Sequence, residues 1–165
     1  MNAYINILKQ TDVFHKFTPT QLELVANLCQ EHTFDIGDII FREDADSDEL
    51  YIITRGKVDI LVNPSLLSSK SDDQHAPVTI ATLRRGQSFG EITLVDQGLR
   101  SATARAAQDN TQLLTIPSDK LMLLCNTYPK LGYRLMLNLA ADLALKIRST
   151  DLRIREELLY GHGNK

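Results

Sequence analysis

The sequence predicts an α+β fold that is mainly β, with helices at both ends of the chain. Three observations support this prediction. Apolar residues recur at helical spacing within residues 3–33. Residues 34–116 are short β-type runs separated by turn residues. Residues 129–160 form one long helical stretch that opens on a proline. The 165 residues are enough for one domain with a substantial core.

The first helical region is predicted over residues 3–33. Thr18 is placed to cap a helix with Pro19 in its first turn, and an apolar stripe follows at helical spacing. From Phe34 onward, alternation and turn residues predict strands instead. These strands fall within residues 36–42, 50–54, 58–62, 78–83 and 112–116, with a further strand of small residues after Arg100-Ser101. The polar residues 63–77 are predicted to be a long connection between two strands.

The C-terminal part is predicted to hold two helices, over residues 118–127 and 129–160. The second has a length of roughly 48 Å at 1.5 Å per residue. A heptad-type seam runs along it through Met136, Ala140, Leu143, Ile147, Thr150, Ile154 and Glu157. Leu135, Leu139 and Leu145 are expected to face the β-domain. The helix either folds back on its own domain or pairs with a second copy, and the seam favours a parallel homodimer.

One stretch carries recognisable binding chemistry, namely residues 89–106 with the sequence FGEITLVDQGLRSATARA. Gly90 lets the backbone approach a ligand closely because it has no Cβ. Glu91 offers a carboxylate that accepts hydrogen bonds from a sugar hydroxyl, and Arg100 offers a planar fork suited to phosphate. An acceptor and a donor fork within so short a segment predict a pocket for a ribose phosphate.

This stretch resembles the phosphate-binding cassette of the cyclic nucleotide-binding domain family. The segment 36–58, with Gly37 and Gly56 at its turns, resembles the same family, although the family usually has glycine where Asp44 stands. The resemblance implies an eight-stranded antiparallel β-roll, jelly-roll-like, flanked by N-terminal helices and a long C-terminal helix. It divides the chain into a nucleotide-binding roll over residues 1–128, a dimerisation helix over 129–160 and a tail over 161–165.

The resemblance also implies the roles of individual residues. Arg100 would pair with the cyclic phosphate and Glu91 would accept from the ribose 2′-hydroxyl. Backbone amides near Gly90 and Ile92 would hold the sugar, and Ser101 would donate its hydroxyl. The expected ligand-binding set is Phe89, Gly90, Glu91, Ile92, Thr93, Arg100, Ser101 and Ala102. The base would be capped from the long helix, where the polar candidates are Asn138, Lys146, Ser149 and Thr150.

The function that we expect is that of a cyclic nucleotide receptor without its own output domain, acting on a protein effector that the sequence does not identify. We expect cAMP as ligand in preference to cGMP, because the helical extension resembles the bacterial catabolite activator. The alternative is a degenerate domain that keeps the fold, binds no nucleotide and serves as a ligand-independent interaction module.

Composition and motif searches argue against other classes of function. A net charge of −3 gives no basic surplus for nucleic acid, no helix-turn-helix segment is present, and no apolar run reaches the length of a membrane span. Four scattered histidines and an acidic loop unlike an EF-hand predict no metal site. No catalytic constellation is recognisable, so neither an enzyme nor a cofactor is expected. Cys29 and Cys125 are expected to be free thiols, which favours the cytoplasm.

Overall fold

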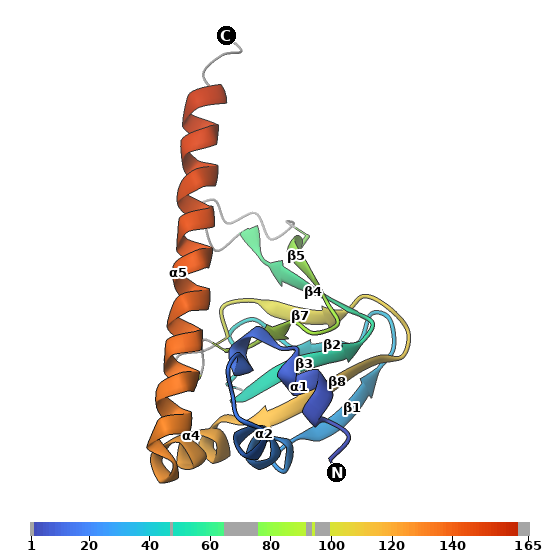
Figure 1. Cartoon of the computed structure of the whole chain (residues 1–165). Coiled ribbons are helices and arrows are strands. Elements are labelled where there is room, and N and C mark those ends of the chain that lie inside the picture. The colour runs from blue at the N-terminus through green and yellow to red at the C-terminus, as the bar shows by residue number, and fades with distance from the viewer. Residues whose placement is uncertain (1, 47, 65–75, 92–93, 95–99, 162–165) are drawn as a thin grey trace.

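Two antiparallel β-sheets form the centre of the molecule, and helices cover one side of them (Figure 1). The computed structural model describes residues 2–46, 48–64, 76–91, 94 and 100–161. In these residues the first sheet has the strand order β1-β8-β3-β6 and the second the order β2-β7-β4-β5. The strands are β1 (Gln30–Phe34), β2 (Ile39–Phe41), β3 (Glu49–Arg55), β4 (Lys57–Val62), β5 (Val78–Arg84), β6 (Ser88–Phe89), β7 (Thr103–Ala106) and β8 (Thr111–Pro117). The predicted eight-stranded roll is therefore confirmed.

Strand β3 shows how the layers are built, because its side chains alternate between two cores. Successive residues of a strand point to opposite faces of the sheet. Leu50 and Ile52 accordingly join the core beneath the helices, whereas Tyr51 and Ile53 join the core between the two sheets. The first sheet is thus covered on both faces, by helices on one side and by the second sheet on the other.

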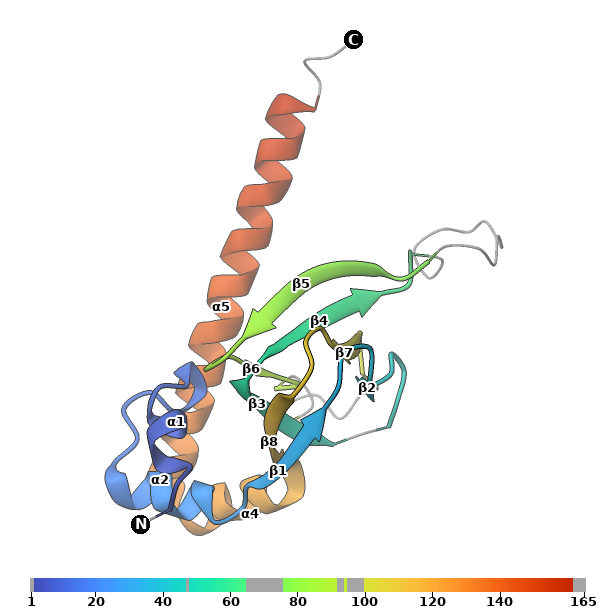
Figure 2. The ribbon, with the colours of Figure 1, turned by 90° about the vertical axis from the view of Figure 1, so that its right-hand side faces the viewer.

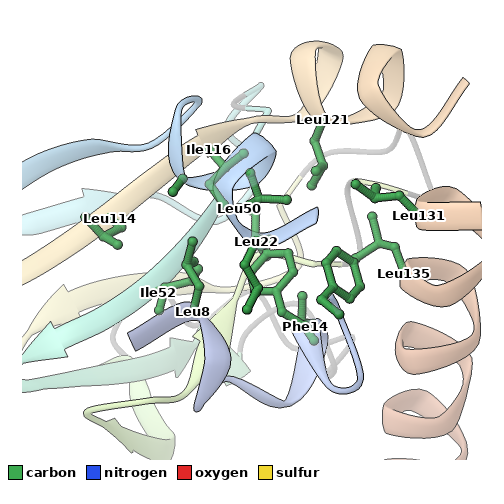
Figure 3. Close-up of a cluster of buried hydrophobic side chains, with 14 of the residues drawn as sticks. Leu8, Phe14, Leu22, Leu50, Ile52, Leu114, Ile116, Leu121, Leu131 and Leu135 are labelled. Carbon is green, nitrogen blue, oxygen red and sulfur yellow. The ribbon is translucent and has the colours of Figure 1, made fainter. Parts of the chain in front are cut away.

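The core beneath the helices collects apolar side chains from distant parts of the sequence (Figure 3). The helical elements are α1 (Ile5–Lys9), the 3₁₀ helix η1 (Asp12–Phe14), α2 (Pro19–Ala26), α4 (Ser118–Thr127) and α5 (Pro129–Tyr160). Phe14 of η1 and Leu135 of α5 lie side by side in this cluster. Thr18 caps α2 as predicted, and a reciprocal bond with Gln21 completes a capping box.

The prediction of a helix up to residue 33 was wrong, because Gln30–Phe34 is strand β1. It pairs antiparallel with β8, placing Gln30 opposite Thr115. Four of its five residues are exposed, so the strand has no hydrophobic alternation that would reveal it in the sequence. Its backbone hydrogen bonds to β8 define it instead. The two-residue strand β6 was also absent from the prediction, because so short a strand has no periodicity.

Helix α5 changes its surroundings halfway along its length. Leu131, Leu135 and Leu139 recur every four residues and are at most 1% exposed, so this stripe packs against the roll. From Ala144 onward every described side chain of the helix is exposed, and the helix projects beyond the sheets (Figure 2). Leu145 is 65% exposed, which corrects the expectation that it faces the β-domain. No helix in the described part of the chain has both the length and the apolar character that crossing a membrane requires.

Candidate functional site

A cavity of about 440 Å³ lies between the second sheet, the cassette, η1 and α5. Six of the eight residues expected to bind ligand line it, namely Phe89, Gly90, Glu91, Arg100, Ser101 and Ala102. Ile92 and Thr93, the other two, lie outside the described residues. The apolar part of the lining comes from Phe41, Ile60, Val62, Ile80, Ala81 and Leu83. The cavity therefore joins a polar end formed by the cassette to an apolar wall formed by β2, β4 and β5.

Arg100 is buried, with 3% of its surface exposed, and the backbone around it fixes its position. Its Nη2 donates to the carbonyl oxygen of Glu49 at 2.7 Å, and its Nη1 donates to the carbonyl oxygen of Gly90 at 3.1 Å. The guanidinium also lies over the ring of Phe41, 4.4 Å from its centroid. These contacts hold the fork at the polar end of the cavity, where an anionic group would meet it.

Burial has an electrostatic consequence for Arg100. Desolvation lowers the pKa of its guanidinium, while Tyr51 and the nearby carboxylates Asp48, Glu49 and Glu91 oppose that shift. An arginine nevertheless remains protonated in proteins at neutral pH. The cavity consequently contains a permanent, partly desolvated positive charge.

Aromatic rings support the arginine and connect it to the core between the sheets. Phe89 and Tyr51 are stacked, with centroids 5.0 Å apart and an interplanar angle of 8°. Phe41 lies 5.5 Å from Tyr51 and 6.0 Å from Phe89. Phe89, an expected ligand-binding residue, is thus mainly part of this core and is 4% exposed. Phe41 and Tyr51 were not identified from the sequence, because apolar strand residues give no sign of which side chain they support.

Glu91 is also buried, and it forms an ion pair with the long helix. Lys146 Nζ donates to Glu91 Oε1 at 2.5 Å, and the same ammonium lies 3.0 Å from Asp142 Oδ2. The side chain of Glu91 is 6% exposed, against 56% for Lys146. Burial acts to lower the pKa of Lys146, but the hydrogen bonds and charges of Glu91 and Asp142 outweigh it and the pKa is raised.

Two of the polar residues of α5 proposed as base readers, Asn138 and Ser149, make contacts away from the cavity, and the side chain of Thr150 lies outside the described part of the structure. Asn138 donates from Nδ2 to the carbonyl oxygens of Val13 and His15, so it joins α5 to the N-terminal segment. Ser149 donates to the Leu145 carbonyl of its own helix. Of the candidates with described side chains, Lys146 alone lines the cavity. Asp142 lines it too and was missed, although its i,i+4 spacing from Lys146 was a usable signal.

The remaining titratable groups of the described residues do not form a metal site. Within the described residues, no three His, Cys, Asp or Glu side chains are grouped closely enough to hold a metal ion. Cys29 and Cys125 are free thiols, and burial raises the pKa of both. Ser101 is exposed at the rim of the cavity, and Ala102 is half-buried there.

Comparison with known proteins is consistent with this geometry. The sequence profile of the cyclic nucleotide-binding domain matches residues 31–128. The chain is 31% identical over 147 residues to the cyclic AMP receptor protein of Thermus thermophilus, which covers 89% of this chain and 62% of the receptor. It is 27% identical over 140 residues to cGMP-dependent protein kinase 2 of Mus musculus, covering 82% of this chain and 18% of the kinase.

Solved structures match over similar spans. The crystal structure of the Thermus thermophilus catabolite activator protein aligns with a TM-score of 0.71 and 29% identity, covering 88% of this chain and 62% of that one. A cyclic nucleotide-binding domain from Methylobacillus flagellatus aligns with a TM-score of 0.74 and 22% identity, covering 93% and 81%. At that identity the second match shows the fold alone. The chain spans less than two thirds of the Thermus protein and less than a fifth of the kinase.

Proposed function

Because the chain belongs to the cyclic nucleotide-binding domain family, we propose that it is a receptor for a cyclic nucleotide and binds cAMP in preference to cGMP. The observation that carries the proposal is the buried guanidinium of Arg100 at the polar end of a cavity of about 440 Å³. Arginine presents a planar donor fork that suits phosphate oxygens, and a partly desolvated charge interacts strongly with an anion.

In the proposed complex, Arg100 binds the cyclic phosphate and Glu91 accepts a hydrogen bond from the ribose 2′-hydroxyl. The backbone amides near Gly90 and Ile92 hold the sugar, and Ser101 donates its hydroxyl to the phosphate or base. Phe89, Thr93 and Ala102 complete the site. The base lies against the apolar wall that contains Ile60, Val62 and Leu83. Binding, rather than catalysis, is the proposed role of this chain.

The preference for cAMP rests on the alignments with two relatives. The relative whose name refers to cyclic AMP matches 89% of this chain, and its alignment includes more residues than that with the cGMP-dependent kinase. Calorimetric titration of the whole chain with cAMP and cGMP tests both points. We expect heat with both nucleotides and a lower Kd for cAMP. Tighter binding of cGMP would reverse the preference, and no heat with either would favour the ligand-independent interaction module.

We further propose that α5 pairs with α5 of a second copy. The exposed half of this helix carries Ile147 and Ile154, seven residues apart and 62% and 50% exposed. A repeat of seven keeps such residues on one seam of a two-helix coiled coil.

Pull-down with and without nucleotide would identify the proposed protein effector. The free thiols support a reducing compartment such as the cytoplasm.

A further inference from the structure

Among the described residues, the carboxylate of Glu91 has a hydrogen-bond partner at one of its two oxygens. Its Oε1 accepts from Lys146 Nζ, whereas Oε2 has no hydrogen bond or ion pair to any described residue. The Glu91 side chain is 6% exposed and lines the cavity, as does Lys146. One oxygen of the carboxylate is therefore fixed by the protein, and the other has capacity for a donor that enters the cavity.

Lys146 is itself held in place from its own helix. Asp142 stands one turn earlier on α5, and its Oδ2 lies 3.0 Å from the ammonium. An ammonium has three donors, so it can serve both carboxylates at once. The arrangement connects two elements 55 residues apart, the cassette and the long helix. Asp142 therefore orients the ammonium of Lys146, and this ammonium in turn orients the carboxylate of Glu91.

The charge of Lys146 matters because Glu91 is buried. A carboxylate removed from water is costly unless it is paired, and the ammonium of Lys146 holds this one in a single orientation. The strength of a hydrogen bond depends steeply on its geometry, so a carboxylate that is free to turn accepts less well from a fixed hydroxyl. Loss of the ammonium would accordingly weaken any hydroxyl bond at Oε2 without touching the hydroxyl.

We propose that Lys146 is a positioning residue for the sugar of the bound nucleotide, holding Oε1 of Glu91 so that Oε2 is oriented to accept the 2′-hydroxyl. This inference rests on the proposed function and assigns a residue of α5 to the ribose. The alternative model is that the ligand and Lys146 compete for the carboxylate of Glu91. Competition predicts that removal of the lysine tightens binding, whereas positioning predicts that it weakens binding and does so only through the 2′-hydroxyl.

The test compares cAMP with 2′-deoxy-cAMP by calorimetry in the wild type, in Lys146→Met and in Lys146→Arg. Wild type is expected to bind cAMP about tenfold or more tighter than the deoxy analogue, as for a hydrogen bond to a charged group. In Lys146→Met this ratio should fall to about threefold or less, with the Kd of the deoxy analogue nearly unchanged. Lys146→Arg keeps a cation and should restore most of the ratio. Lys130→Met, an exposed position on the same helix, is the matched control and should leave the ratio unchanged.

The other outcomes are distinguishable. If Lys146→Met lowered the affinities for cAMP and for 2′-deoxy-cAMP equally, or raised the affinity for cAMP, the positioning role would be overturned. The proposed receptor function would be unaffected. A wild-type ratio near one would likewise overturn the positioning role alone, since the 2′-hydroxyl would then make no bond at Oε2. Failure of the wild type to bind either nucleotide would overturn the proposed function and this inference with it.

Discussion

Gly90 and Arg100 are packed so closely that a side chain at position 90 would collide with the guanidinium. A Cβ built on Gly90 would lie 2.7 Å from Arg100 Nη1 and 2.9 Å from the Glu49 carbonyl oxygen. Gly90 also has a φ of +80°, in the region that favours glycine. The glycine thus allows its own carbonyl to accept from Arg100 and leaves room for the fork.

Gly90→Ala is expected to reduce both stability and nucleotide binding, because an alanine would be strained at this φ and its Cβ would collide with Arg100. The strain alone costs on the order of 1–3 kcal/mol. Gly37→Ala is the matched control, since Gly37 has a φ of +90° but nothing within 4 Å of the added Cβ. Urea denaturation and calorimetry measure the two effects. Equal nucleotide affinity in the two variants would contradict the importance of the contact with Arg100.

Arg100→Ala is expected to weaken cAMP binding by roughly 1.5–3 kcal/mol, about tenfold to a hundredfold, because a charge-assisted hydrogen bond is lost. Arg105→Ala is the control, since that arginine lies on the neighbouring strand β7 with 41% of its side chain exposed. Circular dichroism establishes that each variant is folded before titration. Arg100→Lys should recover part of the affinity, because it restores charge without the fork. Binding that survived Arg100→Ala within about threefold would place the phosphate elsewhere.

The ion pair between Lys146 and Glu91 should be measurable in the absence of ligand by a double-mutant cycle. Lys146→Met, Glu91→Gln and the double variant are compared by urea denaturation. We expect the coupling between them to stabilise the fold by roughly 1 kcal/mol, well below a fully buried pair, because Lys146 is 56% exposed. A coupling of zero would mean that the contact contributes nothing to the unliganded state.

The exposed half of α5 should govern oligomeric state if it pairs with a second copy. The double variant Ile147→Glu and Ile154→Glu places charges on the seam and is expected to convert a dimer into a monomer in sedimentation analysis. Leu145→Glu is the control, because Leu145 is just as exposed, at 65%, but lies off the seam. A wild-type chain that sediments as a monomer at about 100 μM would argue against the paired helix.

The two thiols should react slowly in the folded protein at neutral and mildly alkaline pH. Burial raises the pKa of Cys29 to about 12, so at pH 8 its thiolate fraction is about one in ten thousand. Burial also raises the pKa of Cys125. Alkylation by iodoacetamide at pH 8, followed by mass spectrometry, should label both residues far more slowly in native than in urea-unfolded protein. Rapid native labelling of Cys29 would contradict its desolvated position.

Several local elements followed directly from the residues. Thr18 and Pro19 predicted the start of α2, and Pro129 predicted the start of α5, because capping and a fixed φ act within a few residues. Asp44 stands where the family usually has glycine, and the structure keeps the turn with a φ of +64°. Aspartate tolerates that conformation better than most side chains.

Other features depended on contacts that no local pattern encodes. Strand β1 exists because its backbone pairs with β8, while its side chains are mostly exposed. Asn138 has a polar side chain of the kind that could contact a nucleotide base. It instead donates hydrogen bonds to two backbone carbonyls of the N-terminal segment, more than 120 residues away in the sequence. Leu145 and Leu139 are the same residue type on one helix, but only Leu139 lies where the roll covers it.

The sequence by itself determined the family, the order of helices and strands from β2 to α5 apart from the two-residue strand β6, and the presence of Glu91 and Arg100 in one cassette. These depend on short-range spacing, which backbone geometry converts directly into local structure. The tertiary structure alone decided the surroundings of both charges. In the folded chain the guanidinium of Arg100 lies over the ring of Phe41, and Gly90 packs closely against the same guanidinium. Lys146 contacts Glu91, from which it is 55 residues away in the sequence. Such contacts follow from how the helices and sheets pack, because a buried charge is satisfied by whichever partner the fold places beside it.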